Sequence, residues 1–357
     1  MKKRKKGFKE KEAESILPKS ILLMLINFIV MIFCACAHNN HCMTQDANRT
    51  FVQIWRQDAK RTPEQWDQWF QEIHRLGFSE IIVQWSAYGR VSFHRDQRTD
   101  QESSPSLDAF IQAAQRHKKR VWLGLDYDPD FWQAISGSPD TVQKYLHHRL
   151  QQISQRLPLL LQSVEKNDPQ GQIVKGWYIS DEIDDLNWQA PSRQKVLWAY
   201  LANLRKKLWQ ARTAWPTLIS GFSNGVWPPE QLATFWNETL KRTKIDGFLF
   251  QDGIGADKMT FKRLETYLRF FQANINDADR HFGVIVEIFQ VKNNNSNAST
   301  NLQAADMTRV SQQLALARQY STQPITIFAA PDYLKLDGDA NCRELYKVWR
   351  NDSAMCQ

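Results

Sequence analysis

The sequence alternates short apolar runs with longer amphipathic segments, and this alternation restricts the possible folds more than any other feature of the chain. Eight runs have the length and the β-branched or aromatic content that are typical of buried strands. They are residues 51–55, 80–85, 120–128, 176–180, 217–222, 247–251, 282–289 and 325–330. Because helical segments separate these runs, the strands are predicted to pair in parallel.

Helix signals fill the gaps between the runs. The clearest segment opens with Thr62 as an N-cap and Pro63 at the first helical position, carries Trp66 and Phe70 at helical spacing, and stops at Gly77. The other predicted helices cover residues 105–117, 140–164, 192–211, 229–243, 259–274 and 304–320. Eight strands that alternate with helices over roughly 300 residues predict a single (β/α)₈ TIM barrel of the α/β class.

A doubly wound sheet would show the same alternation. Its nucleotide-binding versions carry a glycine-rich turn after the first strand, and residues 55–58 contain no glycine. The segment GIGADK, which begins at Gly253, is a weak lookalike, because it follows the sixth strand and lacks a third glycine. The barrel is therefore the preferred architecture, and no nucleotide cofactor is expected.

The N-terminus predicts export. A basic run precedes residues 20–37, whose apolar core of about 16 residues suits a signal peptide better than a bilayer-spanning helix. This core ends in Phe33-Cys34-Ala35-Cys36, which resembles a bacterial lipoprotein processing site with Cys36 as the lipidated residue. An uncleaved N-terminal anchor helix remains the alternative. We expect a periplasmic protein tethered to a membrane of the bacterial envelope.

These signals divide the chain into three parts. Residues 1–37 are predicted to be a signal peptide or lipoprotein anchor, residues 38–50 a polar tether, and residues 51–357 the barrel domain. The first 50 residues hold nine Lys or Arg against four acids, so they carry +5 of the net charge of +8 and leave +3 for the barrel. A barrel domain whose net charge is so close to zero gives no reason to expect a nucleic-acid partner.

Cysteine and histidine usage argues against a metal site. The eight His form no HxH or HExxH pattern, and no CxxC pair occurs, so no metal and no cofactor are expected. Five cysteines fit an exported chain with few disulfides, and Cys342 and Cys356 are spaced to close a small C-terminal loop.

Carboxylates follow or interrupt three of the predicted strands. Glu182 comes after the fourth strand, Asp252 after the sixth, and Glu287 lies inside the seventh. Because the carboxyl ends of barrel strands share one rim, these acids are expected to converge there. Strand alternation sets Glu182 on the face opposite to Asp181, and the bulky apolar neighbours of Asp181 favour Glu182 as the inward residue. A single Asp at a strand end is more often a helix cap, but a cluster of several is not explained that way.

The same stretches resemble a known family. FVQIW, IIVQW, WYISDEID, FQDGIG and VEIFQ together look like the bacterial barrel family called domain of unknown function 4434, which is described as glycosyl-hydrolase-like, over residues 51–332. More broadly, they are similar to the four-seven superfamily of glycoside hydrolases, whose acid/base Glu follows strand four and whose nucleophile Glu lies at strand seven. That superfamily usually has Asn before the acid/base Glu, where this chain has Asp181.

The resemblance implies roles for the three acids. Glu182 is assigned as the acid/base and Glu287 as the nucleophile of a retaining glycosidase, while Asp252 tunes one of them or serves as the base of an inverting one. Two carboxyl groups in a partly dry rim push each other's pKa values apart and so divide the two roles.

Aromatic and amide side chains near the strand ends are candidates for sugar contacts, because rings stack on the C–H faces of sugars and polar groups bind their hydroxyls. The predicted substrate-binding residues are Trp55, Trp85, Tyr88, Asp126, Asp181, Asn224, Gln251 and Phe289, with Tyr127, Trp188 and Trp227 as further rim aromatics.

The sequence therefore favours an exported, monomeric barrel that hydrolyses a polysaccharide. Two alternatives remain open: a carbohydrate-binding barrel without catalysis, and an envelope-assembly lipoprotein.

Overall fold

A computed structural model describes residues 42–95, 102–275, 280–292 and 302–356. The predicted signal or anchor segment, including Cys36, lies outside the described residues. Among those that are described, no helix is both long and apolar enough to cross a membrane.

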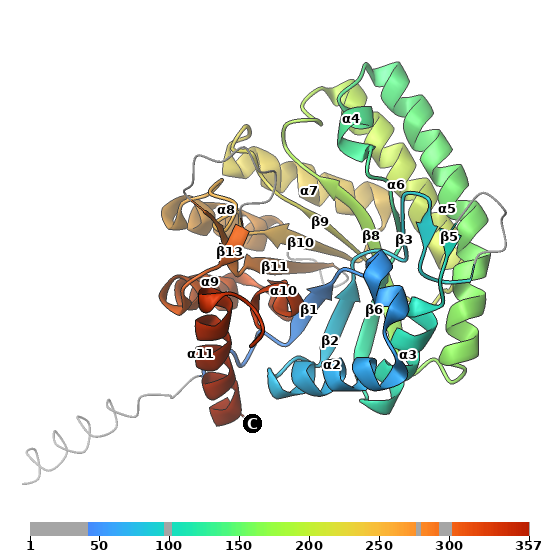
Figure 1. The fold of residues 1–357 in the computed structure, drawn as a ribbon. Coiled ribbons are helices and arrows are strands. Elements are labelled where there is room, and N and C mark those ends of the chain that lie inside the picture. Colours follow the sequence, from blue (N-terminus) through green and yellow to red (C-terminus); the bar gives the residue numbers. More distant parts are fainter. Residues whose placement is uncertain (1–41, 96–101, 276–279, 293–301, 357) are drawn as a thin grey trace, which may run out of the picture. The chain divides into compact units, whose positions relative to one another are not determined.

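Eight parallel strands close into a barrel, as the sequence predicts (Figure 1). In chain order the strands are β1 (Arg49–Val52), β2 (Glu80–Val83), β6 (Arg120–Gly124), β8 (Val174–Ile183), β9 (Thr217–Gly221), β10 (Gly247–Gln251), β11 (His281–Glu287) and β14 (Thr326–Phe328). Neighbours in the chain pair in the barrel, and β14 closes it on β1. The fourth strand is therefore β8 and the seventh is β11.

Helices surround the strands (Figure 1). The predicted segments become α2 (Pro63–Arg75), α3 (Ser106–Arg116), α5 (Pro139–Asn167), α6 (Pro191–Ala211), α7 (Pro229–Thr243), α8 (Phe261–Asn274) and α9 (Met307–Tyr320). Thr62 accepts a hydrogen bond from the Gln65 N–H at 3.3 Å, which is the N-cap that the sequence predicts for α2.

Several elements were not predicted as separate elements. They are the short helices η1 (Arg56–Lys60), α4 (Phe131–Ile135) and α10 (Ala330–Tyr333), the C-terminal α11 (Ala340–Cys356), and the short strands β3 (Ala87–Tyr88), β4 (Val91–Ser92), β5 (Glu102–Ser103), β7 (Asp126–Tyr127), β12 (Phe289–Val291) and β13 (Leu302–Ala304). One of them, β7, falls within the single strand predicted over residues 120–128, which the structure divides after Gly124. The short strands form a four-stranded sheet and a two-stranded hairpin outside the barrel sheet. Strands of two or three residues carry too little periodicity to be recognised in a sequence.

The core has two layers. Inside the barrel, Phe51, Tyr178, Leu249 and Ile285 belong to one buried cluster, and a much larger cluster packs between the strands and the helices. On β10, Leu249 faces the interior, whereas Phe250 packs on Phe271 of α8 at a ring distance of 4.8 Å. Alternation therefore points Gln251 inward and the next residue, Asp252, toward the helices.

The folded domain begins before the predicted boundary at residue 51. The backbone N–H of Thr44 donates to Asp352 of α11 at 2.8 Å, Ala47 is buried, and Arg49 in β1 pairs with Glu80 of β2. Most of the segment predicted as a tether is thus part of the barrel domain, because long-range contacts hold polar residues that look like a linker in the sequence.

The predicted Cys342–Cys356 disulfide is wrong. Cys342 is a free, buried thiol, whereas Cys42 is disulfide-bonded. Spacing along the chain suggested a local loop, but Cys342 lies at the start of α11, where its Sγ contacts the backbone carbonyl of Asp332 at 3.9 Å.

Candidate active site

A cavity of about 600 Å³ lies at the carboxyl ends of the barrel strands. Glu182 from β8 and Glu287 from β11 both line it, together with Gln251 at the end of β10. The loops after the strands complete its wall with Trp132, Ser136, Asp184, Leu186, Asn187, Phe222, Asn224, Gly253, Ala256, Lys258 and Phe289. Carboxylates that lie 105 residues apart in the chain thus share one concave space.

Glu182 faces the barrel mouth. Its Oε1 accepts a hydrogen bond from Gln251 Nε2 at 2.7 Å, and its strand neighbour Ser180 donates to the backbone carbonyl of Gln84 at 2.7 Å. Burial raises the pKa of Glu182 above its ordinary value, while the Gln251 hydrogen bond and the charge of Lys258 oppose the rise. A carboxyl group in this setting retains its proton to a higher pH than a solvated one.

Glu287 is 4% exposed and is held by the loop after β10. Its Oε2 accepts a hydrogen bond from the backbone N–H of Ala256 at 2.8 Å, and a Cβ at Gly255 would lie 2.7 Å from the Glu287 Cβ. Burial, and then the neighbouring Asp252, raise the pKa of Glu287 to about 8. The close approach of the loop depends on a glycine at position 255, since any side chain there would push Glu287 aside.

Asp252 lies behind the cavity, and its side chain is not among those that line it. It is fully buried, and it accepts hydrogen bonds from Gln313 Nε2 of α9 at 2.6 Å and from the Ile254 N–H at 3.2 Å. Burial raises its pKa to about 7. Asp252 therefore does not face the cavity, where the base of an inverting enzyme would have to lie, and its tuning of Glu287 stays a prediction.

Asp126 and Asp181 do not contact the cavity either. Arg156 of α5 donates to Asp126 at 2.6 Å, while Asp181 accepts from Arg149 at 3.2 Å and from Tyr200 at 2.5 Å. Both carboxylates are buried and face the helix layer. Each carboxylate compensates a buried arginine and does not line the cavity, and the predicted contact of both with substrate stays a prediction.

The predicted aromatic residues separate into two groups. Trp85, Trp188 and Trp227 are buried, and the Trp85 Nε1 donates to the Ile54 carbonyl at 2.8 Å, so these rings pack in the core. Trp55, Tyr88 and Tyr127 are half-buried and form a cluster with Trp85, in which Tyr88 stacks on Tyr127 at 5.5 Å. Burial, and then the Glu182 carboxyl, raise the pKa of Tyr127 to about 12, but none of the four rings of this cluster lines the cavity.

Gln251, Asn224 and Phe289 line the cavity as predicted substrate contacts would. Asn224 donates through Nδ2 to Asp184 at 3.0 Å, and Asp184 also accepts from Asn187. These amides and this carboxylate form one polar wall of the cavity.

The sequence analysis did not predict several residues that line the cavity, among them Trp132, Phe222 and Lys258. Trp132 lies on the unpredicted α4 and packs on Phe222 at a ring distance of 5.6 Å. Lys258 belongs to the GIGADK segment, which resembles a nucleotide-binding loop only weakly. Its position one loop after the sixth strand was the available signal, since every loop at that end of a barrel faces the same mouth.

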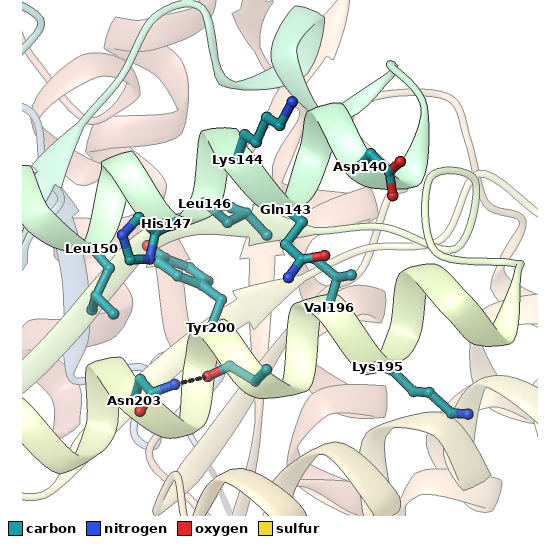
Figure 2. Close-up of a pocket in the computed structure, with 11 residues that line it drawn as sticks. Asp140, Gln143, Lys144, Leu146, His147, Leu150, Lys195, Val196, Tyr200 and Asn203 are labelled. Atoms are coloured by element: carbon teal, nitrogen blue, oxygen red, sulfur yellow. Dashed lines mark hydrogen bonds between the residues drawn. The ribbon is translucent and has the colours of Figure 1, made fainter.

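A second cavity, of about 790 Å³, lies between α5 and α6 on the outside of the barrel (Figure 2). Leu146, His147 and Leu150 line it from α5, and Val196, Tyr200 and Asn203 line it from α6. It contains no pair of strand-end carboxylates and is not the candidate active site.

Within the described ranges, no group of three or more His, Cys, Asp and Glu side chains is arranged to hold a metal ion.

Comparisons with known proteins agree with this architecture. The model of a family named domain of unknown function (DUF4434) matches residues 48–338. The uncharacterised protein YbcH of Escherichia coli (strain K12) is 30% identical over 239 residues, which cover 66% of this chain and 75% of YbcH.

Solved structures share the fold. A candidate α-L-fucosidase from Bacteroides thetaiotaomicron superposes with a TM-score of 0.64 at 16% identity and covers 86% of this chain and 93% of its own. A β-galactosidase from Marinomonas ef1 has a TM-score of 0.54 at 8% identity, covering 86% of this chain and 58% of its own. The xylanase XynB from Paenibacillus barcinonensis superposes with a TM-score of 0.50 at 11% identity and covers 83% of this chain and 88% of its own. At such identities the likeness is one of fold.

Proposed function

We propose, since the chain belongs to the family called domain of unknown function 4434, that it is a glycoside hydrolase acting on a polysaccharide. The observation that carries this proposal is the meeting of Glu182 and Glu287 in one cavity at the ends of the fourth and seventh strands. Glycosidic hydrolysis needs one protonated and one ionised carboxyl group on either side of the scissile bond.

Glu182 serves as the acid/base in this proposal. Gln251 occupies one of its carboxyl oxygens, which leaves the other to carry the proton that is donated to the leaving group. The raised pKa of Glu182 supports this role, because a general acid must still hold its proton near the working pH.

Glu287 serves as the nucleophile of a retaining reaction. The Ala256 N–H fixes one oxygen and favours the ionised form, so the other is free to attack the anomeric carbon. Asp252 and Glu287 are two buried neighbours that titrate as a pair, and Glu287 has the higher pKa, so the nucleophile is fully ionised once the pair has lost both protons.

The wall of the cavity fits a sugar ring. Phe222, Trp132 and Phe289 offer ring faces to C–H groups, and Asn187 and Asn224 offer hydrogen bonds to hydroxyls. In the four-seven superfamily, the residue before the acid/base Glu contacts the sugar 2-hydroxyl. The corresponding residue here, Asp181, is bound by Arg149 and Tyr200 instead, so in this proposal Asn187 or Asn224 makes that contact.

The location of the protein belongs to the same proposal. We infer an exported monomer that reaches an envelope or extracellular polysaccharide while Cys36, or an uncleaved N-terminal helix, tethers it to the membrane.

A panel of polysaccharides and aryl glycosides tests the proposal, with release of reducing ends as the measurement. The full chain is compared with Glu182→Gln and Glu287→Gln, and Glu230→Gln on the exposed first turn of α7 is the matched control. We expect each cavity variant to lose about 100- to 10,000-fold in kcat and the control to keep full activity. NMR detection of the first anomer released tests retention.

A second outcome would favour the carbohydrate-binding alternative. If the wild type binds a glycan without turning it over, and both Gln variants bind it equally well, the barrel is a binding module. If nothing in the panel is bound or cleaved, the proposed function is rejected in favour of an assembly role.

A further inference from the structure

Lys258 brings a positive charge to the carboxylate cavity. Its ammonium lies 4.0 Å from the centre of the Phe222 ring and donates a hydrogen bond to Asn224 Oδ1 at 3.0 Å. Of the described residues that line this cavity, it is the one that carries a positive charge, opposite Glu182, Asp184 and Glu287.

The loop that carries Lys258 has a fixed shape. The backbone N–H groups of Lys258 and Met259 both donate to the carbonyl of Gly253, at 2.9 and 3.1 Å, and Asp257 adopts a left-handed conformation with φ of 57°. The same loop supplies the Ala256 N–H that binds Glu287. One closed loop therefore sets both the nucleophile and the ammonium.

A lysine in a sugar-binding cavity can bind an anionic substituent or compensate acidic side chains. Three carboxyl groups line this cavity against one ammonium, so an anionic sugar would have to compete with them for that single positive charge. The geometry favours compensation over anion recognition.

We propose that Lys258 is a positioning residue whose ammonium, held between Phe222 and Asn224 at the exposed mouth of the cavity, stabilises the ionised forms of the Glu182 and Glu287 carboxyl groups. A role for Lys258 in catalysis rests on the proposed function, whereas its effect on the ionisation of the two carboxyl groups does not. Lysine suits this task because its charge is compact and needs only one anchoring hydrogen bond.

Other groups act on the same carboxyls. Glu287 also faces Asp252 behind it, Arg309 of α9 and Tyr333 of α10. Arg309 Nη2 donates to the backbone carbonyls of Glu287 and Phe289 and adds a second positive charge on the helix side. Loss of Lys258 is therefore expected to shift the titration of Glu287 without abolishing its ionisation.

Glu182 has neutral neighbours apart from the lysine. Gln251 holds one of its oxygens, and the phenols of Tyr127 and Tyr178 lie close by. Asp184 is in reach of the same ammonium. The Lys258 ammonium therefore lowers the pKa values of both Glu182 and Glu287.

The test is the titration of the two carboxyls by NMR in full-length protein labelled with ¹³C at the glutamate side-chain carboxyl. Glu182→Gln and Glu287→Gln assign the two signals. We expect Lys258→Met and Lys258→Gln to raise both midpoints by about one pH unit, and Lys258→Arg to restore them. Lys241→Met, which removes an exposed charge from the last turn of α7, is the matched control and should leave them unchanged.

Activity provides a second readout. The bell-shaped pH profile of kcat/KM in Lys258→Met should move to higher pH on both limbs, with KM for a neutral substrate unchanged. Unchanged midpoints would overturn the inference, and so would a variant whose defect is confined to KM for anionic glycans. If no glycan is hydrolysed at all, the proposed function fails while the NMR titration still decides the role of Lys258.

Discussion

Buried carboxylates of this protein differ in what compensates them. Asp126 and Asp181 each face a buried arginine, and an ion pair of this kind serves the fold. Glu182, which is half-buried, and Glu287, which is buried, have no ion-pair partner within 4 Å among the described residues, and desolvation raises their pKa values. Asp184 and Asp252 share this property, so the lack of an ion-pair partner narrows the choice of candidate catalytic acids, and their position on the fourth and seventh strands completes it.

The raised pKa of Glu287 predicts that stability depends on pH. The folded state holds this proton up to about pH 8, whereas an unfolded glutamate loses it near pH 4.5. The contribution of Glu287 to the free energy of unfolding is therefore fully present below pH 4.5 and is lost as the pH rises through 8. Glu287→Gln should be more stable than the wild type at pH 8, on the order of 4 kcal/mol, and equal to it at pH 4.

Thermal unfolding across this pH range measures the difference. Glu230→Gln, an exposed acid, should show no such dependence and is the control. A gap between Glu287→Gln and wild type that stays constant from pH 4 to pH 8 would contradict the expected titration.

At the scale of elements, the loop after β10 organises the site. Its backbone binds Glu287 through Ala256, its Lys258 lies over Phe222, and Asp252 anchors its start by accepting from the Ile254 N–H. The strands fix the direction of the two acids, and this loop fixes their charge environment.

Replacing Gly255 by alanine tests that element. The new Cβ would lie 2.7 Å from the Glu287 Cβ, so either the loop or the carboxylate must move. Because small displacements of a reacting group cost about 100-fold in rate, we expect a loss of that order in kcat on the best substrate of the panel.

Gly171→Ala is the comparison variant. Gly171 has a φ of 63° and open space around its Cβ position, so alanine there should lower the melting temperature and leave kcat unchanged. Full activity in Gly255→Ala would show that the loop does not position Glu287.

At the scale of the molecule, one barrel carries the whole candidate site. Residues from β8, β10, β11 and the loops that follow them meet at one end, while α11 and the segment before β1 close the barrel through contacts such as Thr44 with Asp352. Every described residue that lines the cavity therefore belongs to the barrel domain.

The proposed tether gives a prediction at this scale. When the full chain is expressed in a bacterium supplied with labelled palmitate, the protein should take up label and fractionate with membranes. Cys36→Ala should abolish both, and Cys34→Ala, two residues away, should abolish neither. Label retained in Cys36→Ala, or an intact N-terminus found by mass spectrometry, would favour the anchor-helix alternative.

Local pattern determined much of this protein. The spacing of apolar runs predicted the eight barrel strands and seven of the helices, since burial on both faces of a parallel strand and on one face of a helix leaves a direct record in the sequence. Alternation along β8 also predicted that Glu182 faces the mouth and Asp181 does not.

Tertiary structure decided what each face meets. Alternation set Phe248, Phe250 and Asp252 on one face of β10, but only packing against α8 and α9 made that face the outer one. Likewise, Asp181 meets Arg149 and Lys258 meets Phe222 across 32 and 36 residues of sequence. The period of apolar residues and their secondary-structure propensity are local properties, so the fold could be predicted from the sequence. Compensation of a buried charge depends on residues that closure of the barrel brings together, so the charge environment of the site could not.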